Sequence, residues 1–293
     1  MKAPRFGISI IPSASGRSDP VAEAIHAEEL GFDLVTVWDH PHGEHPSFET
    51  WTLMTWIAAR TNRIRVASDV LGLPLRLPAL TAKMAESLDR LSNGRLILGL
   101  GGGGSDAEFA GYGAPVRSPD EKVYALEEAL TVIRGAWAEP AFTFQGRHYR
   151  MDGTLLEPKP AHSIPIWLGT YGPRARELTG RLADGWIPSL AYLPLPKARR
   201  SIADVRASAE RAERDPDDLD YAVNVGVRVG GPAPPDQDRR LGGEPDEIIE
   251  GVLEILDAGF TVVNFFVGGR RDEQAERVAR EIVPVVGDAV SAS

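Results

Sequence analysis

The chain has 293 residues, 43% of them hydrophobic and 25% charged, which excludes a disordered chain, a collagen and a coiled coil. It contains no cysteine, so disulfides, iron–sulfur clusters and thiol nucleophiles are excluded as well. The net charge of −10, from 42 acidic and 32 basic residues, argues against a nucleic-acid partner and favours a small-molecule substrate.

Short β-rich runs alternate with longer amphipathic stretches along the chain, as is typical of βα units on a parallel sheet. We expect eight strands, at residues 6–11, 34–38, 64–68, 96–100, 166–169, 185–188, 222–229 and 262–267. We expect eight helices, at about 20–30, 50–59, 80–91, 121–138, 174–182, 201–214, 245–258 and 273–282. Eight strands, each followed by a helix, close into a barrel. The sequence therefore predicts one α/β domain over residues 1–293, a (β/α)8 TIM barrel with short insertions.

Local signals mark several helix ends. Gly31 and Gly259 are expected to end helices, because glycine adopts the left-handed backbone that often follows a last turn. Asp120 is expected to cap the start of the fourth helix. Pro284 is expected to stop the last helix.

Two segments exceed a minimal barrel. Residues 141–151 alternate in polarity and predict a short hairpin, which would either cover the mouth of the barrel or lie on the surface. Residues 230–243 are rich in Pro, Gly, Asp and Arg, and predict a mobile loop.

Asp39 and His40 end the second expected strand, at the barrel face where catalytic residues collect. A histidine held by an adjacent carboxylate can position a ring or exchange a proton near neutral pH. A surface turn capped by Asp39 is the alternative. His42 completes the H-x-H spelling of barrel metal hydrolases, but the later strand ends offer no further ligands, so we expect no metal.

Glycine-rich turns follow the fourth and fifth expected strands. The first fits a G-x-G-x-x-G pattern and lets a flat ring or a phosphate approach the backbone, unless it is only a flexible loop. The second precedes Pro173, which suits the first helical position, so its amides would favour an anion, unless it is an ordinary βα turn. The residues concerned are Gly101, Gly102, Gly103 and Gly104 in the first turn, and Gly169, Thr170, Tyr171 and Gly172 in the second.

The chain resembles the bacterial luciferase-like monooxygenase superfamily over nearly its whole length. The phrases that carry the resemblance are Asp39-His40, PLRLP at 74–78, LDRLSNGRLILGLG at 88–101, PIWLG at 165–169 and ADGW at 183–186. This superfamily groups FMN-dependent monooxygenases with coenzyme F420-dependent oxidoreductases. Its fold is a (β/α)8 barrel with insertions, in agreement with the strand count.

The resemblance implies roles for individual residues. In F420-dependent members an Asp-His pair lies by the deazaflavin, which implies that Asp39 and His40 are catalytic and that Asp39 also binds the cofactor. A non-prolyl cis peptide after the third strand often backs the ring, which implies Val70 and Leu71. The first glycine-rich turn would border the cofactor tail, and the second resembles its phosphate seat.

The spelling Asp39-His40 followed by Glu49-Thr-Trp51 resembles F420-dependent members more than FMN-dependent ones. We therefore expect an F420-dependent oxidoreductase that transfers hydride to or from a small organic substrate, with His40 stabilising or exchanging a proton. An FMN-dependent monooxygenase that uses reduced flavin and O2 is the alternative, and a barrel that binds a ligand without turnover is the third possibility. Sugar-phosphate dehydrogenases of this group carry an acidic residue where this chain has Gly104, so glucose 6-phosphate is not the expected substrate.

Assembly and location are expectations of the same kind. Members of the superfamily are usually dimers or larger, which implies a homodimer or larger homo-oligomer. The chain shows no secretory leader and no apolar run of roughly 18 residues, so we expect a soluble cytoplasmic protein without a membrane partner.

Overall fold

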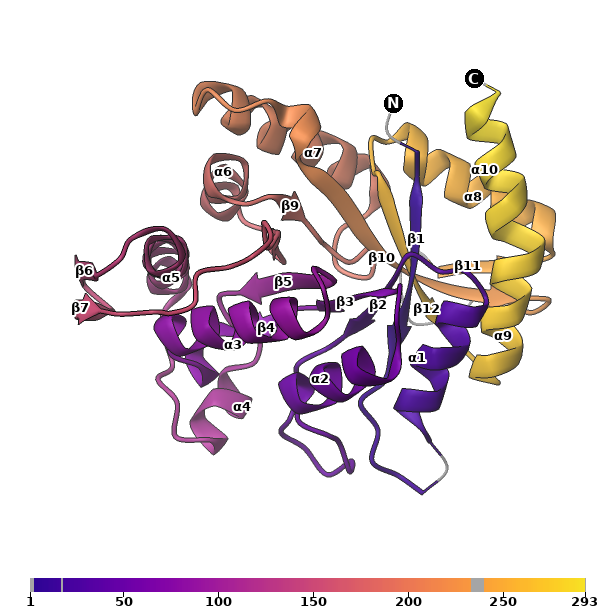
Figure 1. Cartoon of the computed structure of the whole chain (residues 1–293). Helices are drawn as coiled ribbons and strands as arrows, with labels where there is room; N and C mark the ends of the chain where they lie inside the picture. Colours follow the sequence, from indigo (N-terminus) through magenta and orange to yellow (C-terminus); the bar gives the residue numbers. More distant parts are fainter. Residues whose placement is uncertain (1–2, 17, 233–239, 293) are drawn as a thin grey trace.

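A closed ring of eight parallel strands forms the centre of the molecule, with helices around it (Figure 1). The structure is a computed structural model that describes residues 3–16, 18–232 and 240–292. In chain order the strands of the ring are β1 (Arg5–Ile10), β2 (Leu34–Val37), β3 (Arg65–Ser68), β5 (Leu96–Gly101), β8 (Ile166–Leu168), β9 (Gly185–Trp186), β10 (Asp220–Val229) and β12 (Val262–Val267). The ring closes because β10 pairs with both β9 and β12. The predicted (β/α)8 barrel is confirmed.

Four further strands lie outside the ring. β4 (Leu71–Gly72) pairs with β5, and β11 (Arg240–Gly243) pairs with β10. The prediction of a mobile loop at 230–243 is therefore wrong for residues 240–243, which form β11. Residues 233–239 of that segment lie outside the described residues. The expected hairpin is confirmed as β6 (Phe142–Gln145) and β7 (Arg150–Thr154).

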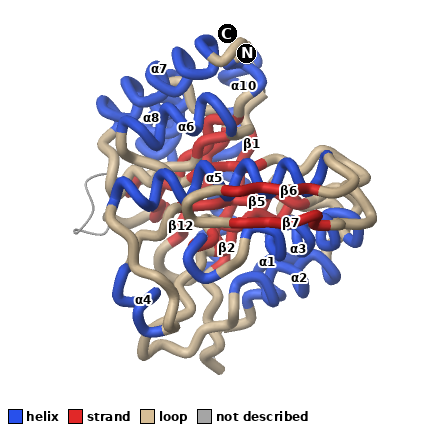
Figure 2. Tube along the Cα trace, turned by 90° about the vertical axis from the view of Figure 1, so that its left-hand side faces the viewer, coloured by secondary structure: helices blue, strands red, loops and turns tan. Residues whose placement is uncertain are grey.

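The hairpin lies on the outer surface along a helix rather than over the mouth of the barrel (Figure 2). Glu128 of that helix accepts hydrogen bonds from the backbone N–H groups of Arg147, His148 and Tyr149 at 2.7–3.0 Å. These hydrogen bonds satisfy the backbone N–H groups of the hairpin turn and fix the turn to the helix.

The eight predicted helices are present, and the described residues add two that were not predicted, at 106–111 and 283–291. They are α1 (Pro20–Glu29), α2 (Thr50–Arg60), α3 (Pro78–Leu91), α4 (Asp106–Gly111), α5 (Pro119–Ala138), α6 (Pro173–Leu182), α7 (Leu195–Arg211), α8 (Pro245–Asp257), α9 (Arg271–Arg277) and α10 (Val283–Ser291). A π-helical turn, Val278–Ile282, joins α9 to α10. α7 begins at Leu195 rather than at 201, because a proline in the first turn of a helix loses no hydrogen bond. No helix of the described residues is both long and apolar enough to span a bilayer.

Glycine ends two of these helices as predicted. Gly31 and Gly259 follow the last turns of α1 and α8 with φ of +89° and +105°. The cap predicted at Asp120 is wrong, because Ser118 caps α5. The Ser118 side chain accepts from the N–H of Glu121, and the Glu121 carboxylate accepts from the N–H of Ser118.

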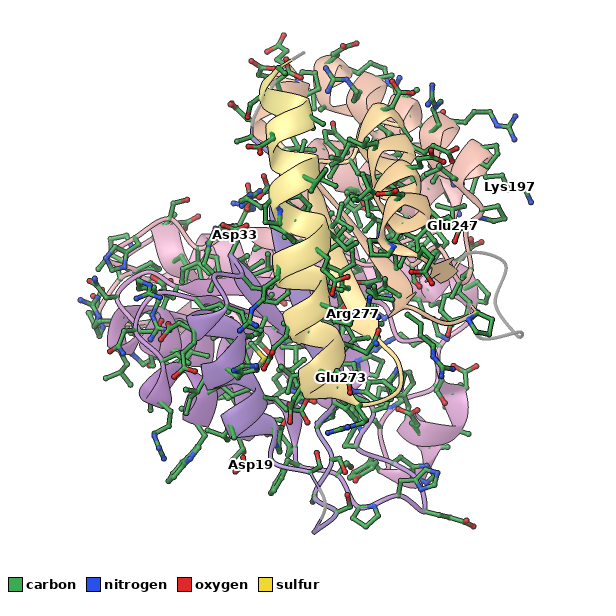
Figure 3. All side chains as sticks on the ribbon, turned by 90° about the vertical axis from the view of Figure 1, so that its right-hand side faces the viewer. Asp19, Asp33, Lys197, Glu247, Glu273 and Arg277 are labelled. Carbon is green, nitrogen blue, oxygen red and sulfur yellow. The ribbon has the colours of Figure 1, made fainter. Side chains whose placement is uncertain are left out.

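Pro284 does not stop the last helix, contrary to the sequence expectation. It lies in the first turn of α10, where its missing N–H is not needed, and the chain stays helical to Ser291. The column formed by α9, the π-helical turn and α10 packs beside the barrel (Figure 3). Arg277 ties this column to the sheet by donating to the backbone oxygen of Val229 at 2.9 Å.

The interior of the ring changes from apolar to polar along the strands. The strands β2, β10 and β12 point Leu34, Ala222 and Val262 into the ring. Two positions further along each strand, the same face carries a polar side chain instead. These polar side chains, which form a layer below the C-terminal strand ends, belong to Thr36, Asn224 and Asn264. The apolar cluster beneath them consists of Leu34, Ala67, Ile97, Trp167, Ile187, Ala222 and Val262.

Candidate active site

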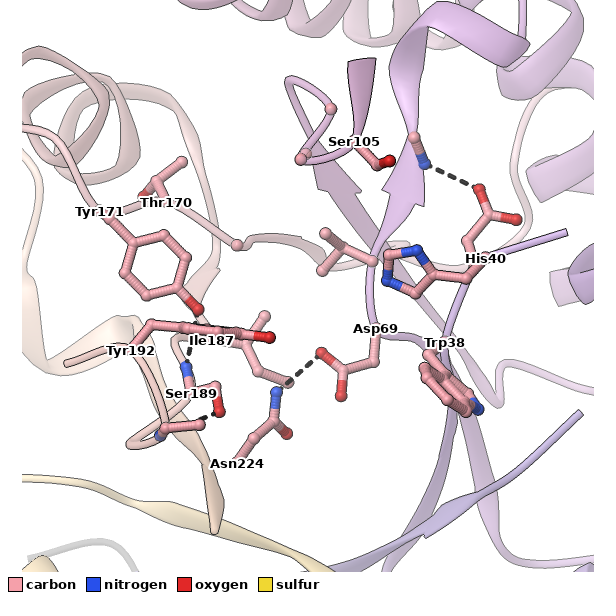
Figure 4. A pocket seen from close by; sticks show the side chains of 18 of the residues that line it. Trp38, His40, Asp69, Ser105, Thr170, Tyr171, Ile187, Ser189, Tyr192 and Asn224 are labelled. Atoms are coloured by element: carbon pink, nitrogen blue, oxygen red, sulfur yellow. Dashed lines mark hydrogen bonds between the residues drawn. The ribbon is translucent and has the colours of Figure 1, made fainter. Parts of the chain in front are cut away.

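A cavity of about 1000 Å³ opens at the C-terminal ends of the barrel strands. The loops after β2, β3, β5, β8 and β9 line it together with β10, β12 and parts of α4 and α5. Figure 4 shows the side chains that converge there. All site residues proposed from the sequence lie on this cavity: Asp39, His40, Val70, Leu71, Gly101, Gly102, Gly103, Gly104, Gly169, Thr170, Tyr171 and Gly172.

Asp39 supports the wall of the cavity. Its buried carboxylate accepts two hydrogen bonds from the guanidinium of Arg76, at 2.6 and 3.0 Å, and one from the backbone N–H of Gly72 at 2.8 Å. Burial alone would lower the pKa of Arg76, but its bonds to Asp39 and Glu49 outweigh burial and raise that pKa. Asp39 thus clamps the end of β2 to the loop after β3, and both of its oxygens are used in doing so.

His40 faces the cavity from the opposite side of the chain. Its Nδ1 lies 2.8 Å from an oxygen of Glu108, and the ring meets the edge of Trp38 at 5.6 Å. The expectation that Asp39 holds this histidine is therefore wrong, because consecutive residues of an extended segment point in opposite directions. A carboxylate fixes one nitrogen of an imidazole and leaves Nε2 to act on a ligand.

Glu108 is a site residue that the sequence reasoning missed. It lies on α4, one turn after the glycine-rich loop, with only 14% of its side chain exposed. The available signal was the pair of acidic residues in the segment that follows Gly104, since a short helix there returns a carboxylate to the loop. Position 104, where related sugar-phosphate dehydrogenases carry an acidic residue, is glycine here. The carboxylate that faces His40 comes instead from Glu108 on α4.

Two glycines make room for Val70. A Cβ atom on Gly101 would lie 2.8 Å from Val70 Cγ2, and one on Gly169 would lie 2.9 Å from the same atom. A non-prolyl cis peptide does follow the third strand, but it joins Asp69 to Val70, one bond before the Val70–Leu71 pair that the resemblance implied. Leu71, in contrast, packs its side chain into the hydrophobic core. Val70 is thus the residue that presents this bend to the cavity.

Other glycines leave open space. A Cβ atom on Gly104 or on Gly172 would have no heavy atom within 4 Å. Position 103 requires glycine for two reasons. Its φ is +101°, and a Cβ atom there would lie only 2.4 Å from the ring of Phe109. The open cradle expected of the glycine-rich turns therefore lies at Gly104 and Gly172.

The turn before α6 offers backbone groups rather than side chains. Gly172 is the N-cap residue and Pro173 begins the helix, as predicted. The hydroxyl of Thr170 points to Thr179 at 2.9 Å, and that of Tyr171 accepts from the N–H of Ser189 at 3.0 Å. Their side chains are therefore engaged with the protein, and an anion would meet the amides at the start of α6.

Asp69 is the second residue that the sequence reasoning missed. Its carboxylate accepts from Asn224 Nδ2 at 3.0 Å and lies 3.5 Å from the hydroxyl of Thr36. Burial raises the pKa of Asp69 to about 6, and the hydrogen bonds from Asn224 and Thr36 only partly oppose this effect. Nothing in the strand pattern marks an aspartate after β3 as a hydrogen-bonded residue of the site, because its partners come from β2 and from β10, 155 residues away.

The described residues hold no group of three or more His, Cys, Asp or Glu side chains that could bind a metal ion. His42 packs instead against Tyr112, with ring centroids 6.1 Å apart.

Comparison with known proteins agrees with this architecture. The sequence profile of the luciferase-like monooxygenase family matches residues 9–240. An F420-dependent glucose-6-phosphate dehydrogenase of Nakamurella multipartita is 31% identical over 76% of this chain and 67% of that enzyme. A 5,10-methylenetetrahydromethanopterin reductase of Methanolobus tindarius is 32% identical over 74% of this chain and 63% of that enzyme.

A solved structure with the same architecture is an F420-dependent secondary alcohol dehydrogenase in complex with an F420-acetone adduct. It superposes with a TM-score of 0.87 at 20% identity, over 97% of this chain and 99% of that one. At this identity the likeness shows the fold. The fold and the cavity define an α/β-barrel protein with a large cavity at the C-terminal strand ends. The family match goes further: the chain belongs to the luciferase-like monooxygenase family.

The raised pKa of Asp69 predicts a stabilising substitution. An acid whose pKa is raised on folding costs stability as the pH rises from its unfolded value, 3.8, through its folded value, about 6. Asp69→Asn is neutral throughout and can still accept from Asn224. We expect it to stabilise the protein by up to about 3 kcal/mol at pH 7.5 and by much less at pH 4.5, measured by urea denaturation. Asp152→Asn on the surface hairpin is the matched control, and a destabilised Asp69→Asn protein at pH 7.5 would contradict the prediction.

Proposed function

We propose that this protein is a coenzyme F420-dependent oxidoreductase, which transfers hydride between the deazaflavin and a small organic substrate. The observation that carries the proposal is the His40–Glu108 pair facing a cavity with an open glycine cradle at Gly104 and Gly172. The similarity to a glucose-6-phosphate dehydrogenase that is named as F420-dependent supports F420 over FMN as the cofactor.

The residues present fit a flat ring with an anionic tail. Gly104 and Gly172 leave room at the backbone, Val70 offers an apolar surface to a ring, and the amides at the start of α6 favour negative charge. The Asp39–Arg76 clamp holds the loop that carries Val70. When bound there, the deazaflavin would supply two-electron hydride chemistry.

His40 would move the proton that accompanies hydride transfer. With Nδ1 held by Glu108, its Nε2 is the atom free to give a proton to, or take one from, a carbonyl or alcohol oxygen of the substrate. Half of the His40 side chain is exposed, so this nitrogen can exchange protons with solvent between turnovers. Glu108 orients the ring through this contact.

Cofactor binding is the first test. The purified protein should quench the fluorescence of F420 on titration with a Kd in the micromolar range or below, and should bind FMN at least tenfold more weakly. Binding of FMN without binding of F420 would overturn the proposal in favour of a flavin-dependent monooxygenase. If neither cofactor binds, the barrel holds some other ligand.

The second test concerns His40. Once a substrate is found by following F420 absorbance with a panel of small alcohols and ketones, His40→Ala should slow hydride transfer roughly 10²–10³-fold in single turnovers. The Kd for F420 should change less than about threefold, because His40 is not part of the cradle. Glu108→Gln should cause a smaller loss in the same direction. A His40→Ala protein with the wild-type rate would remove His40 from the mechanism.

We also propose that the chain forms a homo-oligomer through the outer faces of α2 and α3. Four large apolar side chains there are more than half exposed, which is typical of protein contact surfaces: Trp56, Leu77, Leu80 and Leu91. Light scattering after gel filtration should give a dimer or larger species, and the double variant Trp56→Glu/Leu80→Glu should shift it to the monomer. Leu155→Glu, at an exposed position beside the hairpin, is the matched control. A monomeric wild-type protein at tens of micromolar would contradict the proposal.

A further inference from the structure

The Asp69 carboxyl group lies at the floor of the cavity and has no part in the roles assigned so far. Figure 4 shows it between His40 on one side and Asn224 and Tyr171 on the other. Its backbone N–H is bonded to the oxygen of Val37 at 2.8 Å, so the end of β3 fixes its place. Asp69 is thus held in position on the cavity wall, next to the polar layer.

The polar layer beneath orients its hydrogen atoms toward Asp69. Asn264 is fully buried and donates through Nδ2 to Thr36 Oγ1 at 2.9 Å and to Asn224 Oδ1 at 2.8 Å. Thr36 and Asn224 are therefore used as acceptors from below, and each donates one hydrogen bond onward to Asp69. The carboxylate is held as an acceptor, with one oxygen bonded to each of them.

Asp69 faces the cavity without a counter-ion. The cationic side chains on the cavity wall are paired elsewhere, Lys122 with Asp106 at 2.6 Å and Arg271 with Glu23 at 2.8 Å. Among the described ion pairs none includes Asp69. A carboxylate oxygen has more acceptor positions than the single hydrogen bond each receives here, so unused lone pairs remain beside the cavity. An N–H donor on a ligand would satisfy them, whereas an anionic group would be repelled.

We propose that Asp69 is a cofactor-binding residue whose carboxylate accepts a hydrogen bond from the imide N–H of the deazaflavin ring. This inference rests on the proposed function, because it requires the ring to occupy the cavity. The imide N–H is an uncharged donor on a flat ring, and a carboxylate that has no counter-ion can accept a hydrogen bond from it. The residue also sets what the floor rejects, namely phosphate and carboxylate groups.

Cofactor affinity should then depend on pH. Burial raises the pKa of Asp69 to about 6, and the other titratable groups that face it are His40 and Tyr171. Burial raises the pKa of Tyr171 to about 12, so this hydroxyl stays neutral where Asp69 titrates. The ionised carboxylate is the better acceptor, and binding should therefore strengthen as the pH rises from 5 to 7.5.

The test measures binding and needs no substrate. The Kd of F420 is determined by fluorescence at pH 5 and pH 7.5 for the wild type, Asp69→Asn, Asp69→Ala and the surface control Asp152→Asn. We expect the two Asp69 variants to bind roughly tenfold to a hundredfold more weakly at pH 7.5, the range for a hydrogen bond to a charged group, with most of the wild-type pH dependence lost. The control should match the wild type at both pH values.

A second arm separates a hydrogen bond from a change of shape. 5-Deazariboflavin and its N3-methyl derivative, which lacks the imide hydrogen, are titrated into the wild type and Asp69→Ala. Methylation should weaken binding to the wild type by tenfold or more and should cost Asp69→Ala much less. Equal costs in the two proteins, or Asp69 variants that bind F420 like the wild type, would overturn the role of Asp69 and leave the proposed function standing. A wild-type protein that binds no deazaflavin overturns the proposed function and this inference with it.

Discussion

The closure of the strand ring through β10 is the constraint on which the rest of the molecule depends. β10 has ten residues, whereas β8 and β9 have three and two, and it pairs with β9 at its start and with β12 along its length. Because every strand of the ring is parallel, closure brings all the C-terminal ends to one face. Residues as distant in the chain as Asp69 and Asn224 then lie within a hydrogen bond of each other.

Hydrogen bonds between buried polar side chains inside the barrel organise the site. Asn264 donates to both Thr36 and Asn224 in a layer inside the ring, although its own Oδ1 has no hydrogen-bond partner there. Thr36 and Asn224 in turn each donate a hydrogen bond to Asp69 at the cavity. The Asp39–Arg76 ion pair stabilises the cavity wall in a similar way. The two charges neutralise each other and hold the loops after β2 and β3 together.

Periodicity and turn residues were enough to predict the ring and the turns that line its cavity, whereas Val70 and Leu71 were implied only by the family resemblance. Apolar runs marked each strand of the ring, and parallel closure made the following residues neighbours. The errors have local causes: Ser118 competes with Asp120 as a cap, and Pro284 is harmless in a first turn. Glu108 and Asp69 could not be assigned from pattern, because their roles depend on partners that only the closed ring supplies.

Val70 and its two neighbouring glycines act as one unit. The side chain fills the gap between β5 and the loop after β8, in the space that Cβ atoms at Gly101 and Gly169 would take. A larger residue at any of the three positions must displace the others, so these positions cannot be changed one at a time. A smaller residue at position 70 would leave space for side chains at positions 101 and 169, and would change the spacing between the end of β5 and the loop after β8. A redesign of the cavity must therefore treat the three positions together.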